Sequence, residues 1–273
     1  ENHSAYIGNV AMTCNNLGAL YYNTKRYKEA EEMYKEALDI YRELAKENYS
    51  AYIGDVAMTC SNLGVLYGNT KRNEEAEEMF KEALDIRREL AKENRGAYIG
   101  DVAMTCNNLG ILYKNTKRNE EAEEMYKEAL EIRRELAKKN YSAYIGNVAS
   151  SCNNLGTFYA DTKRYEKAEA MFEEALGIRR KLVKENYSVY IGEVARSCYN
   201  LGILYKNTDR YKEAEEMYKE ALEIYKELAK ERSESMIDSI ILVYDNLSYL
   251  YKQTNRISEA EHIEKLVSEL KNK

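Results

Sequence analysis

The stretch Asn107-Asn108-Leu109-Gly110-Ile111-Leu112-Tyr113 decides the fold, because close copies of it recur along the whole chain. Its Asn-Leu step returns every 46 residues, at Asn16-Leu17, Asn62-Leu63, Asn108-Leu109, Asn154-Leu155, Asn200-Leu201 and Asn246-Leu247. Six copies of this unit account for the 273 residues. A fixed period of about 20 to 50 residues is typical of solenoids, in which each unit buries its apolar face against its neighbours. The sequence therefore predicts one elongated array of repeats.

Each repeat carries two apolar stripes that indicate two helices. In the first repeat, residues 5 to 23 have apolar side chains at steps of three and four, namely Ile7, Val10, Cys14, Leu17 and Tyr21. After a short link at residues 24 to 26, residues 27 to 46 carry a second such stripe, namely Ala30, Tyr34, Ala37, Tyr41 and Leu44. We name these segments helix A and helix B. Serine favours the position before a helix, so we expect the A helices to be capped by Ser4, Ser50, Ser142 and Ser188.

The repeat boundaries follow from the period. We expect one solenoid domain over residues 1–273, with repeats at about 5–46, 51–92, 97–138, 143–184, 189–230 and 235–273. The last repeat is degenerate, since Tyr244 and Ser248 replace the usual cysteine and glycine, and a polar final repeat suits a solenoid cap. The first residues match the end of a helix B whose body is missing, which indicates a fragment of a longer protein.

The composition indicates an all-α protein and argues against some classes of binding partner. Proline and tryptophan are absent, and 32% of the residues are charged. A net charge of -6 argues against nucleic acid or an acidic membrane surface as the main partner, because both require a basic patch. The sequence has no apolar run long enough for a membrane span or a signal peptide. We therefore expect a cytoplasmic protein.

The five cysteines stand at the same position of successive repeats, as Cys14, Cys60, Cys106, Cys152 and Cys198. Stacked helical layers hold equivalent residues about 8 to 10 Å apart, whereas a disulfide requires Cα atoms within about 7 Å. We expect buried, unpaired thiols in a reducing compartment. The only histidines lie near opposite ends of the chain, so no zinc site is expected. The sequence also offers no catalytic pair and no phosphate-binding loop, so we expect no cofactor and no enzymatic activity.

The repeat resembles a known family. The pattern Cys14-x-x-Leu17-Gly18-x-x-Tyr21, followed by Ala30-x-x-x-Tyr34 and Ala37, is similar to the tetratricopeptide repeat, and the long period resembles the kinesin light chain type and bacterial arrays. The resemblance implies a right-handed superhelix of helix hairpins with a concave groove lined by A helices. Such grooves usually bind peptides or partner helices. Members that bind chaperone tails use a clamp of Lys, Arg and Asn; here Met12 and Asn16 stand where cations would be, which argues against that ligand.

The residues expected to line the groove are amides and thioethers on the side of helix A that faces away from helix B. They are Met12, Asn16, Asn23, Met58, Asn62, Asn69, Met104, Asn108, Asn115, Asn154, Asn200 and Asn207. A primary amide carries donors and an acceptor, so a row of amides can hydrogen-bond an extended peptide backbone, and methionine adds adaptable apolar contact. Two alternatives stay open: the asparagines could instead join neighbouring repeats, and the methionines could be packing residues.

These observations predict a scaffold that binds a peptide or helical segment of a partner protein in the groove. The alternative is a structural, sensing or self-assembling arm of a larger multidomain effector protein. In that alternative the uncapped N-terminal layer would allow end-to-end self-association.

Overall fold

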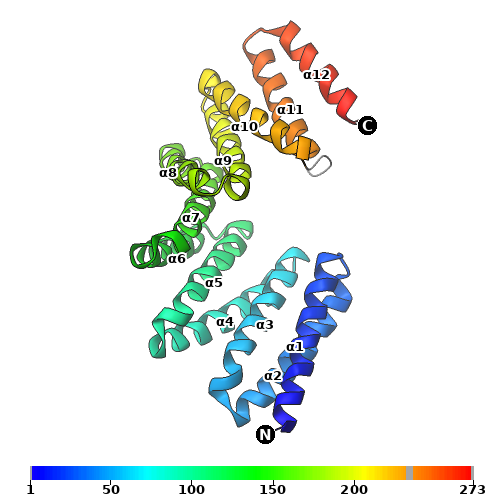
Figure 1. Cartoon of the computed structure of the whole chain (residues 1–273), viewed down its shortest axis with the longest axis vertical. Helices are drawn as coiled ribbons and strands as arrows, with labels where there is room; N and C mark the ends of the chain where they lie inside the picture. The colour runs from blue at the N-terminus through cyan, green and yellow to red at the C-terminus, as the bar shows by residue number, and fades with distance from the viewer. Residues whose placement is uncertain (1, 232–235, 272–273) are drawn as a thin grey trace. The chain divides into compact units, whose positions relative to one another are not determined.

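The computed structural model describes residues 2–231 and 236–271, and these form twelve helices that pair into consecutive antiparallel hairpins (Figure 1). The A helices are α1 (Asn2–Asn23), α3 (Tyr49–Asn69), α5 (Arg95–Asn115), α7 (Tyr141–Asp161), α9 (Tyr187–Asn207) and α11 (Ile237–Gln253). The B helices are α2 (Tyr27–Glu47), α4 (Asn73–Glu93), α6 (Asn119–Lys139), α8 (Tyr165–Glu185), α10 (Tyr211–Glu231) and α12 (Ile257–Lys271). The described residues contain no β-strand. The prediction of an all-α, tetratricopeptide-like solenoid of helix hairpins is confirmed.

The chain divides into two compact units, Glu1–Leu136 and Ala137–Lys273. We call them unit 1 and unit 2 and describe each by itself. In unit 1, α1 packs on α2, α2 on α3, α3 on α4 and α4 on α5. In unit 2, α7 packs on α8, α8 on α9, α9 on α10, α10 on α11 and α11 on α12. The single uninterrupted array stays a prediction.

The helix starts correct one prediction. The A helices begin before the serines, so Ser4, Ser50, Ser142 and Ser188 lie inside the first turn and do not cap it. The cap is the asparagine that ends the preceding repeat: Asn48 Oδ1 accepts a hydrogen bond from the Ala51 amide at 3.3 Å. The same bond joins Asn94 to Ala97 and Asn140 to Ala143. Asparagine and serine cap helices about equally well, so the residue types alone could not decide between neighbouring candidates.

A three-residue turn joins each helix A to its helix B, as the sequence predicts. Its middle residue has a left-handed backbone, with φ 61° at Lys25 and similar values at Lys71, Lys117, Lys163, Asp209 and Asn255. In the first turn the Arg26 amide donates to the Tyr21 carbonyl at 2.8 Å, which closes the end of helix A. The Thr24 hydroxyl donates to the Leu20 carbonyl at 2.9 Å, and the Thr24 amide donates to the same carbonyl at 3.1 Å.

Close packing inside the hairpins depends on the glycine of the Asn-Leu-Gly step. A Cβ atom on Gly64 would lie 2.7 Å from the ring of Phe80, and one on Gly202 would lie 2.5 Å from the ring of Tyr218. Both rings are buried, so a methyl group on either glycine would force a shift in the packing of the hairpin. Only glycine allows helix A and helix B to approach this closely.

The cysteine prediction is confirmed. All five cysteines are buried and unpaired. Burial raises the pKa of Cys60, Cys106 and Cys198 to about 12. These thiols therefore stay protonated at neutral pH and act as small packing residues.

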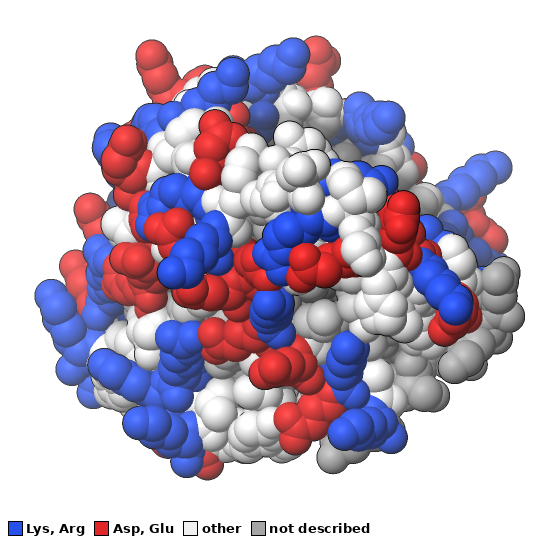
Figure 2. Space-filling model, turned by 90° about the horizontal axis from the view of Figure 1, so that it is seen from above, with Lys and Arg blue, Asp and Glu red and all other residues white. Residues whose placement is uncertain are grey.

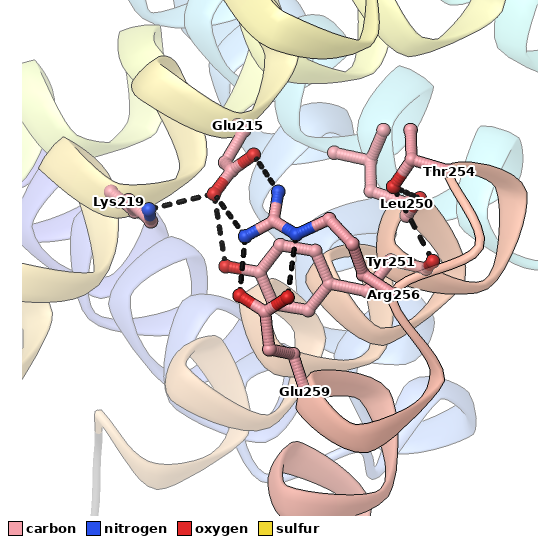
Figure 3. A network of polar contacts seen from close by, with 7 residues as sticks. All are labelled: Glu215, Lys219, Leu250, Tyr251, Thr254, Arg256 and Glu259. Atoms are coloured by element: carbon pink, nitrogen blue, oxygen red, sulfur yellow. Dashed lines mark hydrogen bonds and ion pairs between the residues drawn. The ribbon is translucent and has the colours of Figure 1, made fainter.

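A charged network joins helix B to the turn of the next repeat in several repeats, and Figure 3 shows it around Glu215. Arg256 Nη1 bonds Glu215 Oε2 at 2.6 Å, Lys219 lies 2.6 Å from Oε1, and Tyr251 donates to Oε1 at 3.1 Å. Burial alone would raise the pKa of Glu215, but the bonds from these partners outweigh it and lower the pKa to about 2. The Arg256 guanidinium also lies over the ring of Tyr251, 4.0 Å from its centre.

The same network recurs along the chain. Arg72 bonds Glu31, Arg118 bonds Glu77, and Arg210 bonds Glu169. On the face of the molecule that Figure 2 shows, cationic and anionic side chains are interleaved. Such pairing of opposite charges contributes to the stacking of repeats and leaves the surface mixed in sign. Within the described residues no helix is both long and apolar enough to cross a membrane.

Candidate peptide-binding surface on the A helices

The predicted methionines lie on the outer side of the A helices of unit 1. Met12, Met58 and Met104 are 49%, 36% and 42% exposed. About two helical turns beyond Met104 on the same helix, Ile111 is 40% exposed. Exposed thioethers at the same position of three helices do not serve as core packing, so they are available for adaptable apolar contact. We call the outer side of α1, α3 and α5 the A-helix face of unit 1.

A pocket of about 180 Å³ opens on this face between α3 and α5. Its lining comprises Gly64, Val65, Gly68, Asn69, Phe80, Asn108, Ile111, Leu112 and Asn115. Three of these residues, Asn69, Asn108 and Asn115, are among the predicted groove residues. No lining residue is ionisable, so the pocket combines apolar walls with amide groups and carries no charge of its own.

The pocket lies where a large side chain of the first repeat, Tyr22, is replaced by glycine in the second. In the first repeat Tyr22 reaches across to α3, where its hydroxyl accepts a hydrogen bond from Asn69 Nδ2. The equivalent residue one repeat later is Gly68, and a Cβ atom there would meet nothing within 4 Å. Gly68 thus leaves open the space that a tyrosine would fill beside Asn115.

The asparagines of unit 1 have two different roles. Asn62 Nδ2 donates to Asn15 Oδ1 of the preceding repeat at 3.0 Å, a bond that joins neighbouring A helices. Asn108 stands one repeat after Asn62, but the residue equivalent to Asn15 is then Ser61. The Ser61 hydroxyl is buried without a hydrogen-bond partner. Within the described residues Asn108 also has no side-chain hydrogen bond, so its amide is available to a ligand at the pocket.

In unit 2 the equivalent positions are more strongly tied together. Asn200 Nδ2 donates to Asn153 Oδ1 at 2.8 Å. Asn246 Nδ2 donates to the Tyr199 hydroxyl at 3.1 Å, and its Oδ1 accepts from Lys206 Nζ at 2.7 Å. Burial lowers the pKa of Lys206. These bonds fit the alternative in which asparagines join neighbouring repeats.

The other predicted groove residues are spread along the A helices. Asn16, Asn23 and Asn207 are exposed, and Asn154 is half-buried. Three of the predicted groove residues, Asn69, Asn108 and Asn115, lie together around one pocket.

Two features escaped the sequence analysis. Gly68 was not singled out, although a glycine at the position of Tyr22 was a signal of missing volume. Arg87 and Arg179 were also missed: they stand at the position of Tyr41 on the apolar stripe of helix B and are buried. A cation on an apolar stripe is the signal that could have found them.

The described residues contain no group of three or more histidine, cysteine or acidic side chains arranged to hold a metal ion. The site that remains is a surface of helix hairpins with one uncharged pocket. Fold and site together define an α-solenoid of helix hairpins with exposed polar and apolar side chains on its A helices.

The comparisons with known proteins identify the family. The tetratricopeptide repeat model matches residues 9–89, 55–135, 101–181 and 144–227, which together span most of the sequence, so the chain belongs to the tetratricopeptide repeat family. Repeats of this family generally mediate protein–protein interactions and are typically not catalytic. No curated protein matches the sequence.

Several solved structures share the fold. The crystal structure of BtubC (BKLC) from P. vanneervenii is similar with a TM-score of 0.71 and 24% identity, covering 88% of each chain. PilW, described as a widely conserved type IV pilus biogenesis factor, gives 0.62 and 16% identity over 94% of this chain and 92% of its own. The putative kinesin light chain repeats of Podosopora anserina give 0.60 and 15% identity over 78% of this chain and 94% of theirs. At these identities the likeness establishes the fold alone.

Proposed function

We propose that the chain is a protein-interaction scaffold whose A-helix face in unit 1 binds a peptide or helical segment of a partner protein. One apolar side chain of that segment would enter the pocket beside Gly68. Asn108 and Asn115 would hydrogen-bond the segment's backbone, and Met58 and Met104 would contact its apolar side chains.

The observation that carries this proposal is the uncharged pocket with an unpaired amide at its wall. Its volume of about 180 Å³ lies below the range of about 300 to 1,000 Å³ that is typical of small-molecule sites. The pocket therefore suits a single side chain better than a whole metabolite. An amide half-buried without a partner costs free energy that a ligand hydrogen bond would recover.

The test starts from peptides selected on the purified chain from a random display library. Their affinity is then measured by calorimetry for the wild type, for Gly68→Tyr and for Gly68→Ala. In the first repeat Tyr22 bonds Asn69, so the Gly68→Tyr side chain should lie across the pocket and weaken binding by about tenfold or more. Gly68→Ala adds only one methyl group to open space and serves as the matched control. Equal affinity for all three proteins would refute the proposal.

A second function, self-assembly, is favoured by a different observation. Leu20 is 56% exposed, whereas its equivalent Leu66 is 1% exposed because the preceding helix α2 covers that side of α3. No described helix covers that side of α1. This exposed layer supports the predicted end-to-end association. Light scattering over a concentration series tests it: the wild type should gain mass with concentration, and Leu20→Lys should abolish the gain. A constant monomeric mass for the wild type would exclude self-assembly.

A further inference from the structure

Hydrogen bonds between polar side chains join the A helices of neighbouring repeats. In unit 1, Asn62 Nδ2 donates to Asn15 Oδ1 at 3.0 Å, and in unit 2, Asn200 Nδ2 donates to Asn153 Oδ1 at 2.8 Å. The next junction of unit 2 keeps the pattern with another acceptor, since Asn246 Nδ2 donates to a tyrosine hydroxyl at 3.1 Å. In each bond the donor is the asparagine of the Asn-Leu step, and the acceptor stands 47 residues earlier.

The junction between α3 and α5 lacks this bond. The residue equivalent to Asn15 is Ser61 on α3, and the residue equivalent to Asn62 is Asn108 on α5. A serine hydroxyl ends one covalent bond closer to the backbone than the side-chain oxygen of asparagine. Ser61 is only 6% exposed, and its hydroxyl has no hydrogen-bond partner. Among the described residues Asn108 has no side-chain hydrogen bond either, so both groups at this junction are unpaired.

A second shortened side chain lies at the same junction. Gly68 follows Ser61 by seven residues, so both lie on the same face of α3. On α1 that face carries Asn15 and Tyr22, and both of these side chains reach α3. Serine and glycine at the equivalent positions of α3 leave the Asn108 amide unpaired beside the pocket of about 180 Å³ that it lines. The unpaired amide and the pocket therefore occur together at one junction.

We propose that Ser61 is the positioning residue of the peptide site, because its short side chain leaves the Asn108 amide available and the ligand supplies the missing acceptor. Ser61 does not line the pocket, so it acts through Asn108. At the Asn62 junction Nδ2 bonds the carbonyl oxygen of an uncharged amide. The matching ligand group is therefore a backbone carbonyl of the bound segment. The inference rests on the proposed function and identifies the residue that confines binding to this junction.

The substitution Ser61→Asn tests this role, because it should restore the bond between α3 and α5. The equivalent Asn15 is 6% exposed, as Ser61 is, so the position accommodates an asparagine. The reverse substitution, Asn15→Ser, should break the bond to Asn62 at the first junction and leave Asn108 unchanged. The two variants thus exchange the states of the two junctions.

The first measurement needs no peptide. NMR of the 15N-labelled chain gives the rates at which the side-chain amide protons of Asn62 and Asn108 exchange with water. Both residues are half-buried, so the hydrogen bond is the main difference between them. Asn108 should exchange several-fold faster than Asn62 in the wild type. Ser61→Asn should slow Asn108 to about the rate of Asn62, whereas Asn15→Ser should accelerate Asn62 alone.

The second measurement is the affinity of a display-selected peptide. Ser61→Asn should weaken binding by about fivefold or more, as Asn108→Ala should, because both remove the same donor from the ligand. The double variant should bind no more weakly than Asn108→Ala, since Ser61 acts only through that amide. Asn15→Ser, at a junction outside the pocket, is the matched control and should bind within about twofold of the wild type. A merely structural role for Ser61 would change the urea midpoint and not the affinity.

Equal exchange rates for Asn62 and Asn108 in the wild type would overturn the inference, as would additive losses of affinity in the double variant. If Gly68→Tyr weakens the peptide and Ser61→Asn does not, the inference fails while the proposed function stands. If no peptide can be selected on the chain, the proposed function fails and the role of Ser61 in binding fails with it.

Discussion

Units 1 and 2 bury the same types of residue at equivalent positions, but they differ on the outer side of their A helices. Both units bury the same leucine, cysteine and glycine positions, as Leu63 and Leu201 illustrate at 1% exposure each. On the A-helix face, unit 1 presents three methionines and an uncharged pocket. The same positions in unit 2 carry Ser150 and Arg196, and three charged side chains line a pocket there.

This difference distinguishes the positions that the fold of the repeat requires from the positions at which the residue can change. Interior positions must keep their volume, because each repeat packs on its neighbours with little free space. Positions on the A-helix face touch few neighbours, so their residues can change without loss of the fold. Function is therefore to be sought where the two units differ.

The largest expected effect tests the shared interior. Gly64→Ala in unit 1 and Gly202→Ala in unit 2 would each place a methyl group against a buried ring. Overpacking of this kind costs about 1 to 3 kcal/mol, so both variants should unfold at lower urea concentration than the wild type. Gly68→Ala, in open space, should be neutral or more stable by up to about 1 kcal/mol because alanine favours helices. A loss in only one unit would show that the interiors are not equivalent.

The next effect concerns the charged network and its dependence on pH. The folded pKa of Glu215 is about 2, below the ordinary value of about 4.3. Its ionised form is therefore stabilised by folding above about pH 4.3, and this contribution is lost as the pH falls from there towards 2. Glu215→Gln should lower stability by about 1 to 2 kcal/mol at pH 7 and by progressively less towards pH 2.

Urea unfolding at several pH values measures this difference. Glu216→Gln, on the exposed side of the same helix, is the control and should behave like the wild type. A stability loss in Glu215→Gln that is the same at pH 7 and pH 2 would contradict the assignment.

The smallest effect separates the two roles of the asparagines. Asn62→Ala removes the bond to Asn15 and should cost about 1 kcal/mol of stability. Asn108→Ala breaks no bond within the described residues, so its stability should match the wild type, while its affinity for a selected peptide should fall by about fivefold or more. Equal stability losses in both variants, with peptide affinity unchanged, would assign both asparagines to the stacking of repeats.

The sequence predicted much of the fold because the period and the apolar stripes depend only on local spacing. The turns and the buried cysteines followed directly. The helix caps did not, because Asn48 and Ser50 lie two residues apart and both types can cap. The pocket was not predicted either, since it depends on which side chains meet across helices 47 residues apart, as Tyr22 and Asn69 do in the first repeat.

The buried arginines show the same limit. Spacing places Arg179 on the stripe of helix B, but its partner Ser197 lies 18 residues away on the next helix. Only the packed structure shows that one nitrogen of Arg179 lacks a hydrogen-bond partner.

Methionine methyl NMR tests the central claim, peptide binding on the A-helix face of unit 1, most directly. The chain has nine methionines, and their 13C-methyl signals report on different surfaces. Three lie on the A helices of unit 1, at Met12, Met58 and Met104, and five lie on B helices, at Met33, Met79, Met125, Met171 and Met217. When a display-selected peptide is added, the signals of Met58 and Met104 should shift saturably while those of the five B-helix methionines stay in place. Shifts confined to the B-helix methionines would contradict the account.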